Sequence, residues 1–147
     1  MLEAKQVLTL SAETANALVT AALARAQQDG LNVCVAVVDH AGHLLAFLRS
    51  AQAPLHSTDI AIDKAYTAVS FSRATHLWEP RLAEAGQMLK MGLANRPRFV
   101  GFGGGYPIMI SGMAVGGIGV SGGTETQDMV CATFALDLVS AGGKVTR

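Results

Sequence analysis

The chain has few aromatic and few charged side chains. Of its 147 residues, 5% are Phe, Trp or Tyr and 15% are Asp, Glu, Lys or Arg. Basic and acidic residues number 11 each, so the formal net charge is zero. A surface that binds nucleic acid non-specifically needs an excess of basic side chains to displace counterions, and this composition argues against one. Because 50% of the residues are hydrophobic, the chain is not of the disordered class either.

Long apolar runs and an apolar leader are also missing. Stretches such as VCVAVVD (33–39) are too short to span a bilayer. The start carries Glu3 and Glu13 and has no long apolar run behind a basic cluster, so we expect no signal peptide. The two cysteines, Cys34 and Cys131, lie in apolar surroundings, where buried thiols are expected more than a disulfide. Together these features predict a cytoplasmic protein without a membrane segment.

The chain does contain a regular succession of helical and strand patterns. Apolar periodicity and capping signals predict helices, while short Val- and Ile-rich runs between turns predict strands. The expected helices cover 11–28, 57–71, 76–86 and 125–140, and the expected strands cover 31–39, 44–50, 98–102 (RFVGF), 106–111 and 113–121. Residues 87–98 look irregular, because Gly92 and Pro97 interrupt them. Short turns require antiparallel pairing, so we expect one α+β domain (1–147) with an antiparallel sheet of about five strands.

A glycine motif precedes the last expected helix. Gly117, Gly119 and Gly122 have the spacing of a dinucleotide-binding loop. That fold requires a further parallel strand and an acidic residue about 20 positions on, and the chain ends too early for both. Thr124 and Gln127 instead form the pattern of a helix capping box. The stretch is therefore a capped turn from a strand into a helix, or a corner that binds a polar ligand.

A second glycine cluster supports the ligand-binding alternative. Gly103, Gly104 and Gly105 follow one another inside a strand region, where glycine is costly unless something approaches the backbone. Gly122 and Gly123 remove side chains just before the positive end of a helix. If the two clusters lie on neighbouring strands, they would line one pocket.

Three charged residues stand out beside the glycines. Lys64 lies between Ala61 and Ala68 on the apolar face of its helix, so it must pair with a carboxylate such as Asp39 or reach a ligand. Asp39 ends an apolar strand, where it would cap the following turn or contact a ligand or metal. Arg49 ends the next strand and is either a solvated rim charge or an anion contact.

The histidines show no zinc-binding pattern. Their spacing provides no set of metal ligands, and we predict no metal site; they are His40, His43, His56 and His76. Exposed turn positions explain them most simply. Haem needs only one or two axial ligands, so the sequence leaves haem open.

Four stretches in a fixed order resemble the GlcG/HbpS-like family, also called the haem-degrading or PduO C-terminal-like family. They are VAVVDHAGHLLAFLRS, APLHSTDIAIDKAYTAVSF, FGGGYPIMISG and AVGGIGVSGGTETQD, and the resemblance runs from about residue 5 to residue 142. It implies a profilin-like α-β-α sandwich and a homo-oligomer, a dimer or a larger ring or octamer. The residues that match the family's motifs include Asp39, Arg49, Lys64, Gly103, Gly104, Gly122, Gly123, Thr124 and Gln127.

Three functions remain open at this stage, of which the third is an assembly or reactivation partner for a larger metabolic enzyme. The first is a cytoplasmic homo-oligomer that binds a small ligand, with haem or a corrinoid as the candidates implied by the resemblance, in a catabolic pathway. The second is an enzyme for a small polar or carboxylated metabolite. In that case Lys64 and Asp39 would provide charge and acid–base chemistry, and the backbone N–H groups of Gly123 and Thr124 would hold an oxyanion.

Overall fold

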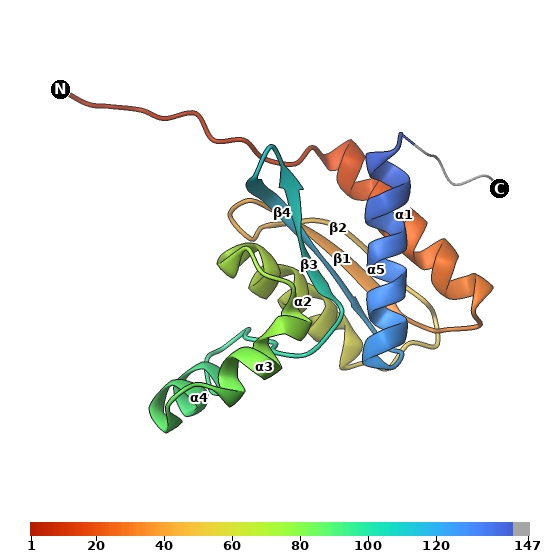
Figure 1. Cartoon of the computed structure of the whole chain (residues 1–147). Coiled ribbons are helices and arrows are strands. Elements are labelled where there is room, and N and C mark those ends of the chain that lie inside the picture. Colours follow the sequence, from red (N-terminus) through yellow and green to blue (C-terminus); the bar gives the residue numbers. More distant parts are fainter. Residues whose placement is uncertain (143–147) are drawn as a thin grey trace.

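The computed structural model describes residues 1–142 (Figure 1). The elements follow in the order α1 (Ala12–Gln28), β1 (Cys34–Asp39), β2 (Leu44–Arg49), α2 (Ser57–Phe71), a 3-10 turn η1 (Thr75–Leu77), α3 (Trp78–Ala83), α4 (Gln87–Ala94), β3 (Gly105–Ile110), β4 (Met113–Ser121) and α5 (Glu125–Ser140). None of the described helices is long and apolar enough to cross a membrane.

The strands form one antiparallel sheet in the order β2-β1-β4-β3. Within it β1 pairs with β2 on one side and with β4 on the other, so the two hairpins meet along β1 and β4. The α+β class and the antiparallel pairing are confirmed. The expected count of about five strands is wrong, since this sheet has four.

The missing strand is RFVGF (98–102). Its Val and Phe residues favour a strand, but its backbone groups bond to a side chain of α2 instead of a neighbouring strand. The Thr67 hydroxyl donates to the carbonyl of Arg98 at 2.9 Å and accepts from the N–H of Val100 at 3.1 Å. The segment is therefore an anchored loop beside α2.

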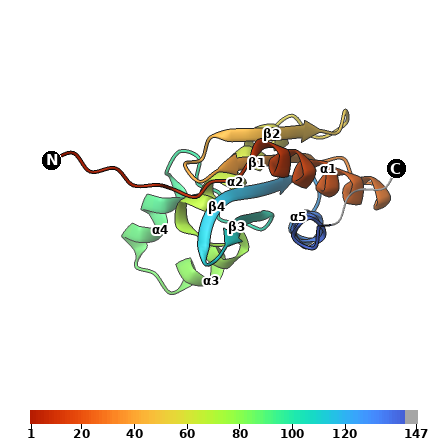
Figure 2. The ribbon, with the colours of Figure 1, turned by 90° about the horizontal axis from the view of Figure 1, so that it is seen from above.

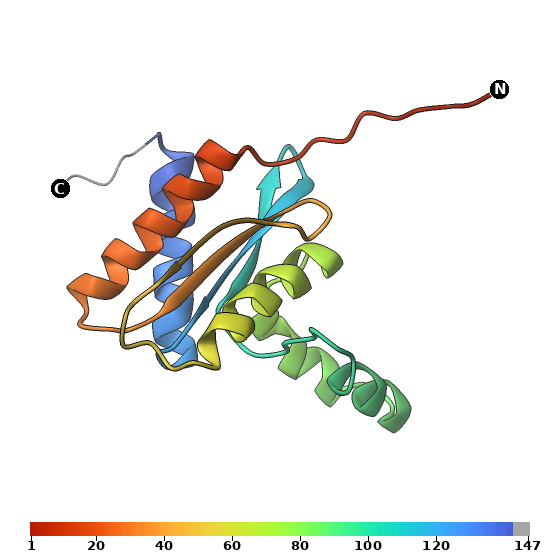
Figure 3. The same ribbon diagram turned by 180° about the vertical axis from the view of Figure 1, so that it is seen from behind.

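The segment expected to be irregular holds a helix, α4. Gly92 lies inside this helix without ending it, and Gly86 occupies the N-cap position. No residue of α4 is buried, and α3 and α4 project from the body of the molecule (Figure 3). The expected helix over 76–86 is shorter than predicted, because a 3-10 turn comes first and α3 ends at Ala83.

Helices cover both faces of the sheet, which makes the fold an α-β-α sandwich. On β1, Val35 and Val37 belong to the core formed with α1 and α5, whereas Ala36 and Val38 pack in the core formed with α2. Figure 2 shows α1 and α5 together on one side of the molecule, with α3 and α4 on the other. The burial of residues 34–38 of β1 is thus explained by helices on both of its faces.

Two of the motif glycines let α2 lie close to the sheet. A Cβ atom at Gly117 would overlap the carbonyl oxygen of Ala65, and one at Gly119 would overlap that of Ala61. The absence of side chains at these positions of β4 therefore sets the distance between helix and sheet. Two of the three glycines in the apparent dinucleotide motif therefore serve packing.

Candidate functional site

The two glycine clusters lie side by side, which is the condition for a shared pocket that we set from the sequence. Gly105 is paired with Gly119 between β3 and β4, and the N–H of Val120 donates to the carbonyl of Gly104 at 3.0 Å. Gly104 has a φ of 127°, and a Cβ atom there would lie 2.6 Å from Nζ of Lys64. The groups that approach this glycine, the carbonyl oxygen of Val120 and Nζ of Lys64, therefore belong to the protein itself.

Lys64 is buried at this corner, with 1% of its surface exposed. Its ammonium donates to the carbonyl of Val120 at 2.8 Å and to Oδ2 of Asp128 at 3.2 Å. It also lies 5.1 Å from the centre of the Phe102 ring. The ion pair anticipated from the helical pattern is present, but the carboxylate is Asp128 and not Asp39. A ligand-facing role for Lys64 stays a prediction.

Burial opposes the charged forms of both partners. It lowers the pKa of Lys64, while the nearby carboxylates of Asp128 and Glu125 act in the opposite direction. Burial likewise raises the pKa of Asp128, which the Lys64 charge and the hydrogen bond from Gly123 partly counteract. The pair connects α2, the end of β4 and the start of α5.

The donors at the start of α5 are already engaged. The N–H of Gly123 donates to Oδ1 of Asp128 at 2.9 Å, and the N–H of Thr124 donates to Oε1 of Gln127 at 2.9 Å. The N–H of Gln127 donates to the Thr124 hydroxyl at 3.2 Å, which confirms the capping box. Side chains of α5 engage both of these donors in this structure, and an oxyanion held by Gly123 and Thr124 stays a prediction.

The other corner glycines also have structural partners. Gly122 adopts a φ of 136°, and a Cβ atom there would lie 2.9 Å from Cα of Val33. The N–H of Gly103 donates to Oε1 of Glu125 at 2.7 Å. The corner is held by internal contacts, so ligand binding by its glycines stays a prediction.

Asp39 caps the β1–β2 turn, as one of the two alternatives proposed. Its Oδ1 accepts from the N–H groups of Ala41 and His43, at 2.9 Å each, and its Oδ2 lies 3.2 Å from Nδ1 of His43. Burial alone would raise the pKa of Asp39, but these hydrogen bonds hold it below its usual value. Asp39 pairs with Gly116, four residues along β4 from the carbonyl that Lys64 binds, or about 13 Å. The structure therefore does not bring Asp39 and Lys64 together.

Arg49 holds the loop that follows β2. Its guanidinium donates to the carbonyl of Ala51 at 3.0 Å and to that of Ala53 at 2.6 Å. These bonds use two of its donors within the chain. A contact with an anion stays a prediction for this side chain.

A cavity of about 650 Å³ lies at the other end of the sheet, beside the N-terminal arm. The arm is fixed at two points, because the N–H of Leu10 donates to the carbonyl of Val115 and the Thr9 hydroxyl accepts from the N–H of His40. Figure 1 shows the first residues extending from the body beyond this point. The cavity is lined by Gln6, Val7, Leu8, His40, Met113 and Ala114.

His40 also lines a second, smaller hollow of about 100 Å³. On its far wall is Tyr66 of α2, against which Gly42 packs without a side chain; a Cβ atom at Gly42 would lie 2.7 Å from the Tyr66 ring. The φ of Gly42 is 85°, so glycine suits this turn for its backbone as well. His40 thus borders two hollows on the same side of the molecule.

The sequence pattern did not predict this site. It grouped His40 with the exposed turn histidines, and nothing near it in the chain pointed to Met113, which lies 73 positions further on. The cavity depends on the arm, the β1–β2 turn and the β3–β4 turn meeting in space. Among residues 1–142, no group of three or more His, Cys, Asp or Glu side chains is placed to hold a metal ion.

Comparisons with known proteins cover nearly the whole chain. A family model described as "Haem degrading protein HbpS-like" matches residues 10–137. An uncharacterised 15.0 kDa protein from the dhaT-dhaS intergenic region of Citrobacter freundii is 36% identical over 140 residues, which cover 95% of this chain and 99% of that protein. The corrinoid adenosyltransferase PduO of Salmonella typhimurium is 35% identical over 133 residues. That match covers 90% of this chain but only 40% of PduO, so the activity of the whole PduO protein does not follow for this chain.

A solved structure agrees with these sequence matches. The crystal structure of the PduOC:heme complex has a TM-score of 0.81 and 36% sequence identity, over 88% of this chain and 94% of that one. Its similarity confirms the α-β-α architecture expected from the sequence. With a family model matching more than four fifths of its length, the chain belongs to the HbpS-like family.

Proposed function

We propose that this protein binds haem in the 650 Å³ cavity beside the N-terminal arm, where the imidazole of His40 would hold the iron. The observation that carries the proposal is the combination of an imidazole and a thioether, from His40 and Met113, in one cavity with apolar walls. Histidine and methionine are both axial ligands of protein-bound haem. A relative of 36% identity has been crystallised in complex with haem, which supports the same ligand here.

The donor set suits haem better than a bare metal ion. Val7 and Leu8 are exposed on the arm beside the cavity, where they would contact an apolar macrocycle. The cavity volume lies within the range of about 300 to 1,000 Å³ that small-molecule sites have. Bound haem would supply one-electron iron chemistry, while the chain itself would provide the imidazole and the apolar contacts.

A corrinoid is the second candidate for the same cavity. It too is a large macrocycle that takes an imidazole on its metal, and a relative of this chain is a corrinoid adenosyltransferase. We keep haem as the first candidate, because the solved relative of similar length holds haem. A titration with aquacobalamin separates the two.

We extend the proposal to a cytoplasmic homo-oligomer that serves a catabolic pathway. Support for self-association comes from α4, which has no buried residue and exposes Met88, Leu89 and Met91. Support for a reducing compartment comes from Cys34 and Cys131, which are both free and buried. Light scattering coupled to size exclusion would measure the mass of the particle, and a 15 kDa monomer at all concentrations would contradict self-association.

The test of haem binding is a spectroscopic titration of the purified apoprotein. We expect a saturable shift of the Soret band, and we expect His40→Ala to weaken it strongly. His43→Ala and His56→Ala are matched controls, because neither residue lines the cavity. Absence of a saturable Soret shift in the wild-type protein would contradict haem binding itself.

A second histidine provides an alternative location for the iron ligand. Nδ1 of His76 is buried without a hydrogen-bond partner among the described residues, and its ring lies 5.8 Å from that of Tyr106. If His40→Ala retained the Soret shift and His76→Ala lost it, haem would bind near η1 and the assignment to His40 would be wrong.

A further inference from the structure

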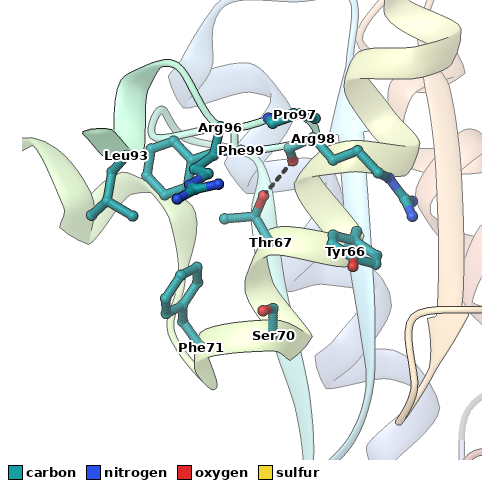
Figure 4. Close-up of a pocket in the computed structure, with 9 residues that line it drawn as sticks. All are labelled: Tyr66, Thr67, Ser70, Phe71, Leu93, Arg96, Pro97, Arg98 and Phe99. Carbon is teal, nitrogen blue, oxygen red and sulfur yellow. Dashed lines mark hydrogen bonds between the residues drawn. The ribbon is translucent and has the colours of Figure 1, made fainter. Parts of the chain in front are cut away.

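A separate cavity lies between α2 and the segment that leads from α4 to β3. Its volume is about 160 Å³, close to that of an engineered protein cavity of about 150 Å³ that holds benzene. It shares no residue with the cavity beside the arm. Nine residues line it, and its apolar walls come from Phe71, Leu93, Pro97 and Phe99 (Figure 4).

Aromatic packing holds one wall of this cavity in place. The ring of Trp78 lies edge to face with Phe71 at 4.8 Å and with Phe99 at 5.2 Å between ring centres. Phe71 and Phe99 themselves are 6.3 Å apart. Three rings that contact one another leave each other little freedom, so this wall exists before any ligand arrives.

The rim of the cavity is also fixed, by Arg98. This residue has a φ of 68°, which is unfavourable for a side-chain-bearing residue, and three contacts hold it there. Its guanidinium lies 3.0 Å from Oδ1 of Asp63 and 3.6 Å from the centre of the Tyr66 ring, and its carbonyl accepts from Thr67. The charge of Arg98 is thus already compensated within the protein.

Arg96 differs from Arg98 in this respect. Its guanidinium forms no hydrogen bond or ion pair with any residue of the described range 1–142. Figure 4 shows it on the side of the cavity near Leu93 and Thr67, whereas the Arg98 guanidinium extends away past Tyr66. No Asp or Glu lines the cavity. An uncompensated cation therefore stands beside an apolar space of the size of one ring.

We infer that this cavity binds a small monocarboxylate with an aromatic or branched apolar body, held by a pair of hydrogen bonds between its carboxylate and Arg96. Guanidinium groups match carboxylates in geometry and charge, and they do so better than a lysine ammonium. The apolar body would fill the space lined by Phe71, Leu93, Pro97 and Phe99. The Ser70 hydroxyl, which also lines the cavity, is an additional hydrogen-bonding group.

Benzoate is the probe for this site, and the protein carries its own reporter. Trp78 is the single tryptophan of the chain and packs against both Phe71 and Phe99. Titration of the apoprotein with benzoate should change Trp78 fluorescence saturably, and calorimetry should give the same dissociation constant. Benzyl alcohol, which has the ring without the charge, should bind at least about tenfold more weakly, since a charged hydrogen bond contributes more than tenfold in affinity.

Two arginine variants separate this site from general attraction by positive charge. Arg96→Gln should weaken benzoate binding about tenfold or more, and Arg96→Lys should recover part of it. Arg81→Gln removes the same charge from an exposed position on α3 that does not line the cavity, and it should bind benzoate as the wild type does. Both positions are exposed, so we expect the variants to fold, and circular dichroism would check this.

The inference is overturned if benzoate gives no saturable binding, if Arg96→Gln binds it as well as the wild type, or if Arg81→Gln weakens it equally. The site is independent of the proposed haem site. His40→Ala should therefore keep benzoate binding whether or not it loses haem. Equal loss of benzoate in His40→Ala would also contradict the assignment to this cavity.

Discussion

Nζ of Lys64 lies 3.2 Å from Oδ2 of Asp128, and both side chains are almost fully buried. Each partner also bonds to backbone groups: the ammonium to the carbonyl of Val120 and the carboxylate to the N–H of Gly123. Helix α2, the end of β4, the turn at Gly123 and the start of α5 therefore meet at one ion pair. Because both charges are buried, the charged form of each residue depends on the other for compensation.

Removing one charge of this pair should destabilise the protein strongly. Lys64→Met leaves the Asp128 carboxylate buried without its counter-charge, and the expected loss in free energy of unfolding is about 3 to 5 kcal/mol. Urea denaturation measures it. Lys5→Met, on the exposed arm, is the control and should change stability by less than about 0.5 kcal/mol.

A double variant checks that the loss comes from the pair. Lys64→Met combined with Asp128→Leu should be less destabilised than the sum of the two single variants, because it leaves no unpaired charge. Additive losses would show that the two residues act separately.

The sequence predicted what depends on neighbours in the chain. The Thr124–Gln127 capping box and the Asp39 turn cap were both found, because each is formed within about four residues. The burial of Lys64 followed from its position on the apolar face of a helix. Its partner did not, since Asp128 is 64 positions away and any carboxylate would have satisfied the pattern.

The incorrect predictions arise partly from contacts between distant segments and partly from local signals that were given too much weight. RFVGF (98–102) has strand-forming residues, but the Thr67 hydroxyl competes for its backbone. Helix α4 was missed because Gly92 and Pro97 suggested an interruption, although Pro97 lies beyond the end of the helix. The cavities could not be predicted from the sequence, because each is formed by segments that are distant in the sequence.

The two cysteines should resist thiol reagents in the folded protein. Burial raises the pKa of Cys131 to about 11 and also raises the pKa of Cys34. At pH 8 both are protonated and shielded, and the thiolate is the reactive form. We expect labelling of neither thiol by iodoacetamide in buffer and of both in denaturant, measured by mass spectrometry. Rapid native labelling of either one would contradict its burial.

Asp39 should contribute to stability above its own pKa and lose this contribution in acid. Its folded-state pKa is lowered, so between that value and the unfolded value of about 3.9 the unfolded state binds more protons. Stability therefore rises with pH through this window and is constant above it. Asp39→Asn should be less stable than the wild type by up to about 1 kcal/mol at pH 7, and the difference should shrink as the pH falls below about 3.9.

A second carboxylate provides the comparison for that pH dependence. Asp137→Asn changes an exposed side chain on α5, which should leave stability within about 0.5 kcal/mol of the wild type. Denaturation midpoints at several pH values measure both variants. A constant difference for Asp39→Asn down to pH 2 would show that its charge is not what stabilises the turn.

The close contact between α2 and the sheet should not tolerate a methyl group on β4. In Gly119→Ala, the new Cβ atom would overlap the carbonyl oxygen of Ala61 and lie 2.7 Å from the amide nitrogen of Ala65. Both are backbone atoms, so the helix as a whole must move, and the expected cost is about 2 to 3 kcal/mol. Gly92→Ala is the matched control: a Cβ atom there meets nothing within 4 Å, and its position inside α4 favours alanine. That variant should gain about 0.5 to 1 kcal/mol in free energy of unfolding, and an equal response of the two glycines would show that α2 does not depend on the bare backbone at Gly119.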